Sequence, residues 1–441
     1  MVKAKMSSKT TIRERASAAK AASIRLAATK SEAKNAALTE IAKALTQRRS
    51  DIVAANQRDL AEAERSHLAP PLLKRLKFDE AKLADVCAGI HSLIKLDDPV
   101  GRTLAATELD AGLELYKVSC PIGVIGVVFE SRPDALVQIS TLCLKSGNAV
   151  LLKGGSEAAH TNRILAETIA AAGEAAGLPS GWIALLETRQ DVADMLELDE
   201  HIDLIVPRGS NEFVRHIMTH TNIPVLGHAD GICHVYIDAD ADPEMAVAIA
   251  VDSKCQYVAV CNAAETLLVD AAIAETLLPA LQGALEAKGV RLRGCERTRA
   301  VIVCEPATDD DWATEYLDLI LSIKVVDGLD DAIDHINRFG SGHTDAIVTA
   351  DKDKAERFMA LVDSADVFWN CSTRFSDGYR YGLGAEVGIS TNKIHARGPV
   401  GLEGLLIYKY KLIGEGHIVA DYSGPTAKPF THKPLDKECR L

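Results

Sequence analysis

Residues 121–129 read Pro-Ile-Gly-Val-Ile-Gly-Val-Val-Phe, a nearly continuous apolar run that is typical of a strand buried on both faces. A helical pattern follows over residues 135–145, and the turn Ser146-Gly-Asn148 leads into a second apolar run, Ala149 to Leu152. Another helical pattern starts near Ser156. The order strand, helix, strand, helix predicts βαβ units around a parallel sheet. We therefore expect an α/β protein.

The alternation continues toward the C-terminus, with strands expected at 181–186 and 201–206 and helices at 190–198 and 210–219. A second α/β region follows. Its expected strands are residues 233–237, 266–269, 301–304, 323–326, 344–349 and 367–370, and its expected helices include residues 243–253, 271–288 and 330–338. A chain of 441 residues exceeds the usual size of one hydrophobic core, so at least two domains are predicted.

Residues 16–95 have the three- and four-residue apolar spacing of helices, interrupted at Pro70-Pro71. The first thirty residues are rich in Lys, Arg, Ala and Ser and contain Glu14 as their only acid, a composition that resembles an organelle transit peptide. The helical spacing nevertheless continues from Ala16 through residues 32–45. We therefore expect a cytoplasmic protein.

Net charge, the length of apolar runs and the spacing of cysteines disfavour several classes of function. The 62 acidic and 49 basic side chains give a net charge of -13, which disfavours binding to nucleic acid. No apolar run is long enough to predict a membrane span. The ten cysteines show no CxxC pair and no Cys/His ligand spacing, so neither a disulfide framework nor a metal site is predicted.

Two strand ends carry groups that suit a nucleotide. Lys153 follows the strand at 149–152 and is expected at the carboxyl edge of the sheet, where α/β proteins bind ligands, although a solvated lysine would give the same pattern. Gly209 and Ser210 follow the strand at 201–206. They predict a tight turn and a helix start that can bind an anion, or simply an ordinary capped turn.

Cys261 differs from the other cysteines by its position. It lies in the segment between a helix that is expected to end near residue 254 and the strand that begins at Thr266. Such a connection is where functional side chains concentrate. Several other cysteines are interpreted as small buried hydrophobic residues: Cys87, Cys143, Cys233, Cys304 and Cys371.

Five stretches together resemble the γ-glutamyl phosphate reductases, a family within the aldehyde dehydrogenase superfamily. They are residues 121–134 (PIGVIGVVFESRPD), 153–155 (KGG), 261–266 (CNAAET), 369–378 (WNCSTRFSDG) and 384–404 (GAEVGISTNKIHARGPVGLEG). The resemblance runs in order from about Ala16 to Tyr410, and strings of this length are far more specific than a short motif.

The resemblance implies an aldehyde dehydrogenase-like fold with a Rossmann-type cofactor domain, an α/β catalytic domain and a β oligomerisation arm. It also implies reduction of γ-glutamyl phosphate by NADPH to glutamate 5-semialdehyde, a step of proline synthesis. Cys261 matches the nucleophile, since a thiolate attacks an acyl phosphate and leaves a thioester that accepts hydride. Lys153, Gly209, Ser210 and Glu315 match cofactor-binding positions, although Glu315 also fits a solvated carboxylate.

The sequence departs from the superfamily at two points. Where general aldehyde dehydrogenases carry a glutamate base that hydrolyses the thioester, this chain has Leu226-Gly-His-Ala-Asp-Gly231, and His228 is a polar neighbour of the site or a structural residue. The asparagine that binds the oxyanion is replaced by Ser131-Arg132, so Ser131, Arg132 and Asn262 all remain candidate donors beside the Cys261 N–H. Arg374, followed by Arg132, is expected to bind the anionic substrate.

The resemblance also divides the chain and suggests partners. Residues 1–102 and 119–228 are expected to bind NADP, residues 229–403 to carry the catalytic residues, and residues 103–118 and 404–420 to form the arm of a homodimer or homotetramer. Residues 421–441 are expected to be a tail, loosely structured beyond Gly414. Besides the small-molecule substrate, glutamate 5-kinase is a suggested partner. Two alternatives stay open: another thiol-dependent aldehyde or acyl-CoA dehydrogenase of this fold, and an inactive NADP-binding module.

Overall fold

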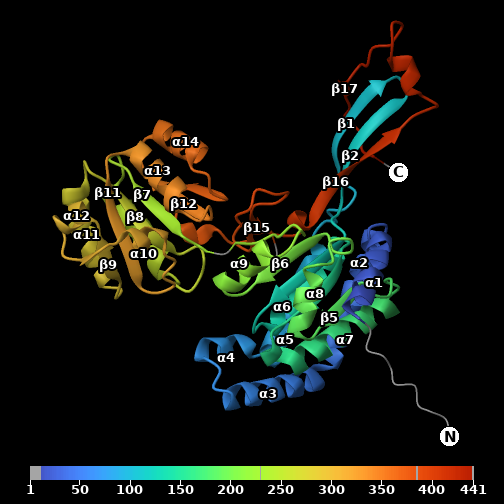
Figure 1. Ribbon diagram of the computed structural model, residues 1–441, viewed down its shortest axis with the longest axis horizontal. Helices are drawn as coiled ribbons and strands as arrows, with labels where there is room; N and C mark the ends of the chain where they lie inside the picture. The colour runs from blue at the N-terminus through green and yellow to red at the C-terminus, as the bar shows by residue number, and fades with distance from the viewer. Residues whose placement is uncertain (1–10, 229, 384–385, 440–441) are drawn as a thin grey trace. The chain divides into compact units, whose positions relative to one another are not determined.

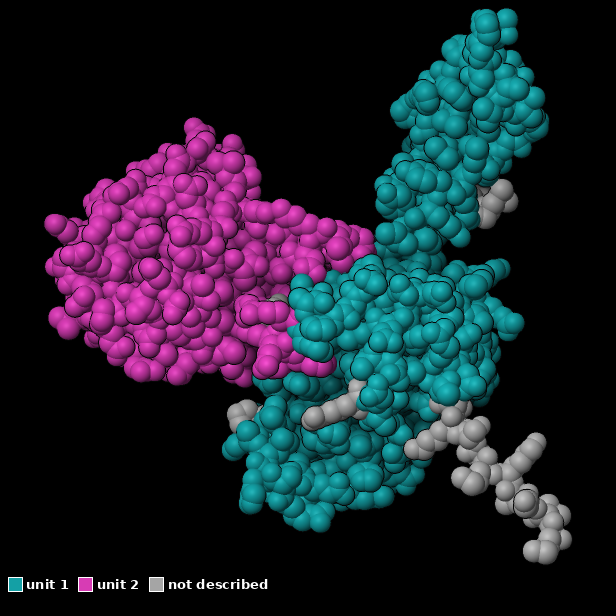
Figure 2. Space-filling model, in the orientation of Figure 1, with its two compact units in different colours: residues 1–209, 216–225, 401–441 teal, residues 210–215, 226–400 magenta. Residues whose placement is uncertain are grey.

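The computed structural model describes residues 11–228, 230–383 and 386–439. The chain forms two compact units, shown in different colours in Figure 2. Unit 1 comprises residues 1–209, 216–225 and 401–441, and unit 2 comprises residues 210–215 and 226–400. The extreme N-terminus with its basic residues, Ala229, and residues 384–385 of the quoted motif lie outside the described residues.

Five helices open unit 1, as the sequence predicts: α1 (Ile12–Leu26), α2 (Ser31–Gln47), α3 (Arg49–Arg65), α4 (Pro70–Leu76) and α5 (Glu80–Lys95). Thr11 caps α1, because its side chain accepts from the Glu14 N–H and the Glu14 carboxylate accepts from the Thr11 N–H. The helical spacing that runs on from Ala16 is broken at residues 27–30, between α1 and α2. Pro70 begins α4, where its missing N–H costs no hydrogen bond.

The parallel sheet of unit 1 has the order β5-β4-β3-β6. Its strands are β3 (Val124–Phe129), β4 (Ala149–Lys153), β5 (Ile183–Leu186) and β6 (Leu204–Arg208), and its connecting helices are α6 (Pro133–Lys145), α7 (Ala159–Ala175), α8 (Arg189–Met195) and α9 (Asn211–Thr219). Every residue of β3 is buried. All pairings are parallel, which confirms the prediction made from residues 121–152. Figure 1 labels β5 and β6 of this sheet and its helices α6, α7, α8 and α9.

A separate antiparallel sheet in unit 1 has the order β16-β2-β1-β17. Its strands are β1 (Thr103–Asp110), β2 (Leu113–Pro121), β16 (Leu406–Ile413) and β17 (Lys433–Pro434). Strands β1, β2 and β16 lie largely within the two segments expected to form the arm, residues 103–118 and 404–420, and β17 adds a fourth strand from the expected tail. Residues beyond 414 are also more ordered than expected, with a short 3-10 helix at Val419–Tyr422 and β17 paired to β1.

Unit 2 is built on a seven-stranded parallel sheet of order β10-β9-β11-β8-β7-β12-β13. Its strands are β7 (Cys233–Ile237), β8 (Ala264–Asp270), β9 (Arg291–Gly294), β10 (Glu305–Pro306), β11 (Ile320–Val326), β12 (Thr344–Val348) and β13 (Asp366–Trp369). Its helices are α10 (Pro243–Cys255), α11 (Ala274–Glu286), α12 (Glu296–Arg299), α13 (Leu329–Phe339) and α14 (Lys352–Leu361), and a small two-stranded sheet pairs β14 (Gly388–Ser390) with β15 (Gly398–Val400).

One predicted strand of unit 2 is wrong. Residues 301–304 form a turn after α12, where the N–H groups of Val301 and Ile302 both donate to the Thr298 carbonyl oxygen. Those donors are then not available to a strand ladder, and Val303 is 86% exposed. The strand in this region is β9. It contains no apolar run, because two of its four residues are arginines.

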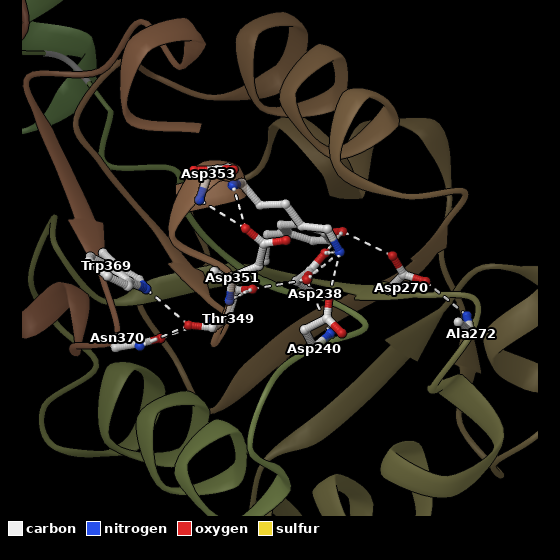
Figure 3. Close-up of polar contacts among 11 residues, drawn as sticks. Asp238, Asp240, Asp270, Ala272, Thr349, Asp351, Asp353, Trp369 and Asn370 are labelled. Atoms are coloured by element: carbon white, nitrogen blue, oxygen red, sulfur yellow. Dashed lines mark hydrogen bonds and ion pairs between the residues drawn. The ribbon is translucent and has the colours of Figure 1, made fainter. Parts of the chain in front are cut away.

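At the carboxyl ends of β7, β8 and β12, polar side chains form an internal network (Figure 3). Lys354 Nζ lies 2.9 Å and 2.7 Å from carboxylate oxygens of Asp238 and Asp240. Thr349 donates its hydroxyl hydrogen to Asp238, and the Tyr236 hydroxyl lies 3.1 Å from both Asp238 and Asp270. The acids at this edge are thus neutralised and hydrogen-bonded internally.

Within the described ranges, no helix is both long and apolar enough to cross a membrane.

Candidate active site around Cys261

Cys261 lies in the connection between α10 and β8, as the sequence predicts. Gly231 approaches this segment so closely that a Cβ placed there would lie 2.1 Å from the Cys261 carbonyl oxygen. Only glycine therefore fits at position 231 without moving the backbone that carries Cys261. The close approach fixes the position of the cysteine relative to the start of β7.

A histidine stands next to the sulfur. His343, immediately before β12, has its Nε2 atom 3.1 Å from Cys261 Sγ. The ring is fully buried, and burial, helped by the nearby His228, lowers the pKa of His343 well below its ordinary value. His343 is therefore neutral at pH 7 and can accept a proton from a thiol.

The strand register adds Thr344 and Asp366 to this pair. Thr344 on β12 is the register partner of Asp366 on β13, and its Oγ1 lies 2.8 Å from His343 Nδ1. Burial raises the pKa of Asp366, while hydrogen bonds from Tyr381, Ser376 and Thr344 oppose the rise. In the neutral tautomer with its hydrogen on Nδ1, His343 donates that hydrogen to Thr344 Oγ1. The Nε2 lone pair of His343 then faces Cys261.

His228 lies against the same histidine. Its ring centroid is 4.9 Å from that of His343, edge to face, and its Nδ1 atom is 3.0 Å from the Ile389 carbonyl oxygen. A carbonyl oxygen can only accept, so Nδ1 carries a hydrogen. The sequence left His228 as a polar neighbour of the site or a structural residue, and this contact makes it a neighbour.

Cys233 is more than the space-filling hydrophobic residue that the sequence predicts. It is fully buried, and its thiol donates to the Cys261 carbonyl oxygen across 3.2 Å. Burial raises the pKa of Cys233 well above the ordinary thiol value. Cys233 therefore remains a thiol that holds the backbone of Cys261, and it is a poor nucleophile itself.

Arg374 and Asn262 join the site through one short element. Arg374 lies in the 3-10 helix Thr373–Phe375, and the Thr373 hydroxyl donates to the Asn262 carbonyl oxygen at 2.7 Å. The Asn262 amide donates to the Ser376 carbonyl oxygen at 2.6 Å, so it holds this element in place. Burial, followed by Arg380, lowers the pKa of Arg374, while the charge of Cys261 acts the other way. Arg374 therefore belongs to an element that is hydrogen-bonded to the residue after Cys261.

The predicted oxyanion residues of unit 1 have their own partners. Ser131 is buried with a φ of 42°, and its N–H and hydroxyl both donate to Glu157 Oε1, at 2.6 Å and 2.5 Å. Arg132 is half exposed, with a guanidinium nitrogen 3.3 Å from an Asp134 oxygen. The pairing of either residue with Cys261 stays a prediction.

Of the predicted cofactor residues, Lys153 ends β4 and is buried, with its ammonium bonded to the Gly154 carbonyl oxygen. Gly209 and Ser210 form the connection from β6 to α9. Asn211, the first residue of α9, donates to Glu315 Oε2 at 2.6 Å. Glu315 is thereby tied to the helix start that follows Ser210.

Sequence reasoning missed His343, Thr344 and Asp366. His343 precedes a predicted strand, but it is 82 residues from Cys261 and no spacing rule joins them. The one available signal is the segment Ser341-Gly-His343, in which a histidine follows a glycine just before a buried strand.

Comparisons with known proteins agree with this architecture. The family model described as aldehyde dehydrogenase family matches residues 1–293. A γ-glutamyl phosphate reductase of Pelotomaculum thermopropionicum is 68% identical over 95% of this chain and 96% of its own length. One of Methanococcoides burtonii is 54% identical over 97% of this chain and 98% of its own.

Solved structures give the same result. The crystal structure of γ-glutamyl phosphate reductase from Thermotoga maritima superimposes with a TM-score of 0.90 at 38% identity, covering 92% of this chain and 99% of that one. An acetylating aldehyde dehydrogenase from Geobacillus thermoglucosidasius shares the fold, with a TM-score of 0.61 at 17% identity and coverage of 92% and 97%. The chain belongs to the aldehyde dehydrogenase family.

Proposed function

We propose that this protein is a γ-glutamyl phosphate reductase, which reduces L-γ-glutamyl 5-phosphate to L-glutamate 5-semialdehyde with NADPH and releases phosphate in proline biosynthesis. The observation that carries the proposal is the Cys261 sulfur 3.1 Å from the neutral, buried His343. The high identity to relatives of that name, over nearly their whole length, supports the substrate.

Cys261 is the nucleophile of this reaction. As its sulfur attacks the acyl carbon, the thiol proton passes to His343 Nε2. The C–O bond to phosphate breaks with its electron pair on oxygen, and His343 returns the proton to the departing phosphate. The products of this half-reaction are a Cys261 thioester and hydrogen phosphate.

The cofactor residues fit a nicotinamide nucleotide. Lys153 is a buried cation at the carboxyl edge of a parallel sheet, and Ser210 precedes a helix whose first residue holds Glu315. When bound, the nucleotide supplies the hydride that reduces the acyl group. Cys261 is then expelled as thiolate when the thiohemiacetal collapses to aldehyde, and a solvent proton restores the thiol.

The segment after β6 lacks the glutamate that activates water for thioester hydrolysis in related enzymes. The segment 226–231, where related enzymes carry a glutamate, offers His228, whose ring packs on His343 instead. Hydrolysis of the thioester would waste the activated substrate, so the reductase gains from lacking that glutamate. Arg374 beside Cys261 binds the phosphate or the α-carboxylate, and Arg132 is the second candidate.

The reverse reaction tests the proposal. With glutamate 5-semialdehyde and NADP⁺, reduction of NADP⁺ should require inorganic phosphate, and Cys261→Ser should retain less than about 1% of the rate. Cys304→Ser, a change at another partly buried thiol of unit 2, is the control and should keep its activity. Turnover that requires CoA instead of phosphate, or that requires neither, would show that the chain catalyses a different reaction of the aldehyde dehydrogenase superfamily.

The same assay addresses the choice of cofactor. The Lys153 ammonium should favour the additional 2′-phosphate of NADP⁺, so Lys153→Ala should reduce the preference for NADP⁺ over NAD⁺. Equal preference in wild type and variant would remove this role from Lys153.

Three further proposals follow from the same function. We place the enzyme in the cytoplasm, where amino-acid synthesis supplies its substrate, and we propose a homodimer or homotetramer that assembles through β16 and its sheet. Association with glutamate 5-kinase would deliver the labile acyl phosphate directly.

A further inference from the structure

Three metal-binding side chains meet at the Cys261 sulfur. His228, Cys261 and His343 each offer one ligand atom, and these atoms all lie within 4.8 Å of one another. The residues are far apart in the sequence, which explains why ligand spacing alone predicted no metal site. Two imidazoles and one thiolate form a donor set that Zn²⁺ prefers.

Each histidine has an oxygen atom beside its Nδ1 atom. The Ile389 carbonyl oxygen, 3.0 Å from His228 Nδ1, fixes a hydrogen on that nitrogen. The Thr344 hydroxyl oxygen lies 2.8 Å from His343 Nδ1 and can accept a hydrogen there. Hydrogen bonds of this kind to the far nitrogen are the usual support of metal-binding histidines, because they orient the ring and keep the ligating lone pair.

The geometry is close to that of a bound ion. Tetrahedral zinc with ordinary bond lengths separates a sulfur and a nitrogen ligand by ~3.6 Å and two nitrogen ligands by ~3.3 Å. His343 Nε2 is 3.1 Å from Cys261 Sγ, and no ligand pair exceeds 4.8 Å. Shifts of about 1 Å, achievable by side-chain rotation, would therefore complete three ligands, and water would supply the fourth.

Solvent exposure allows an ion to reach the three side chains, and the local charge limits how tightly it binds. His343 is buried, but His228 and Cys261 are only partly buried. Binding replaces the thiol hydrogen of Cys261 by the metal and releases that proton to solvent. The nearby Arg374 opposes a cation, so the site should bind zinc reversibly and less tightly than a structural zinc site does.

We propose that His228, Cys261 and His343 form a reversible Zn²⁺ site that occupies the nucleophile and arrests the enzyme. Binding of the ion follows from the three side chains alone. The arrest rests on the function proposed above, because coordination to the metal lowers the nucleophilicity of the sulfur and occupies the His343 nitrogen that accepts the thiol proton.

Cobalt(II) gives a direct test without substrate. The reduced full-length protein, freed of metal, should develop a thiolate-to-cobalt charge-transfer absorption band that Zn²⁺ abolishes by displacement. The band should be lost in Cys261→Ser, and His228→Gln should weaken binding about 100-fold. The controls Cys304→Ser and His91→Gln, which alter a thiol and an exposed histidine elsewhere, should behave as wild type.

Activity supplies the second measurement. Relative to its own rate in EDTA, His228→Gln should require about 100-fold more Zn²⁺ than wild type for half-maximal inhibition. Absence of the band, or the same band in Cys261→Ser, would overturn the site. A protein that shows the band but no reductase activity would keep the zinc site and refute the proposed function instead.

Discussion

Around Cys261, polar side chains form a series of contacts that begins at the sulfur atom. The sulfur faces His343, whose other ring nitrogen lies 2.8 Å from Thr344 Oγ1, and Thr344 is the register partner of Asp366. A hydroxyl oxygen that accepts from Nδ1–H keeps the lone pair of His343 on Nε2. Thr344 thereby favours the tautomer of His343 that can take a proton from the sulfur.

Replacing Thr344 by a residue without a hydroxyl group tests its effect on the tautomer of His343. Thr344→Val should lower kcat about tenfold with little change in KM, and it should slow alkylation of Cys261 by iodoacetamide, because His343 loses the group that fixes its tautomer. Thr344→Ser should restore both.

Thr266→Val is the matched control. Thr266 is also a buried strand threonine of unit 2, but its hydroxyl has no hydrogen-bond partner among the residues described. A kcat loss of equal size in both valine variants would reduce the role of Thr344 to packing.

The residues identified from sequence and those missed differ in a physical way. Cys261 could be found because its place between a helix and a strand is a local property. His343 and Asp366 could not, because their meeting with Cys261 depends on β12 and β13 lying beside β7 in the sheet. Local patterns identify strands, but strand order is a property of the whole sheet.

At the scale of elements, whether a strand could be predicted from the sequence depends on how deeply it is buried. Buried strands such as β3, and β4 up to its final Lys153, are apolar and were predicted within a few residues. β1 was missed because it belongs to a thin sheet and is mostly partly exposed, so selection for apolar residues is weak along it.

The carboxyl edge of the sheet in unit 2 gives a stability prediction. Lys354 on α14 neutralises Asp238, whose side chain is 1% exposed. Lys354→Met should lower the free energy of unfolding by about 3 kcal/mol, because it leaves a buried carboxylate without its cation. Urea denaturation measures the loss.

Its control is on the same helix. Lys352 forms an exposed pair with Glu356, so Lys352→Met should change stability by less than about 0.5 kcal/mol. Similar losses in both variants would mean that the network at Asp238 contributes no more than a surface ion pair.

A buried histidine on α13 gives unit 2 a pH dependence. Burial, with His234 and nearby cations, lowers the pKa of His335 to about 3 from an ordinary 6.5. Between pH 6.5 and about pH 3, His335 is protonated in the unfolded chain but stays neutral in the folded chain. The free energy of unfolding therefore falls as the pH drops below 6.5. One such histidine contributes about 1.4 kcal/mol per pH unit.

His335→Gln should therefore flatten the dependence of the melting temperature on pH between neutrality and mild acid. An unchanged slope in the variant would show that other groups dominate. His343, with its pKa lowered by burial, acts in the same direction and remains in that variant.

At the scale of the whole molecule, the exposed side chains of β16 support the proposed oligomer. Tyr408, Tyr410 and Leu412 are 45%, 60% and 57% exposed, and β16 is an edge strand of its sheet. An apolar edge of this kind is normally covered by symmetric pairing with a second copy.

We expect Tyr408→Asp and Tyr410→Asp to shift the protein toward monomer in light scattering, because each places a charge on the apolar face. Lys409→Asp, a charge change on the opposite face of the same strand, should leave assembly intact. An unmutated protein that scatters as an active monomer near 47.3 kDa would exclude the oligomer.

The sequence predicts two α/β regions but does not show how the chain is divided between them. Unit 1 takes its residues from both ends of the chain, because β16 and β17 pair with β2 and β1. Whether these units divide the cofactor and catalytic roles as expected stays a prediction.

The pairing of β16 with β2 has a consequence during translation. β2 leaves the ribosome almost three hundred residues before β16 is made, since they occupy residues 113–121 and 406–413. Throughout that interval one edge of β2 lacks its neighbour, while residues 226–400 of unit 2 emerge without a break and can fold first. The nascent chain therefore carries an unpaired strand edge until synthesis is nearly complete, and this is the interval in which a chaperone would be most useful to it.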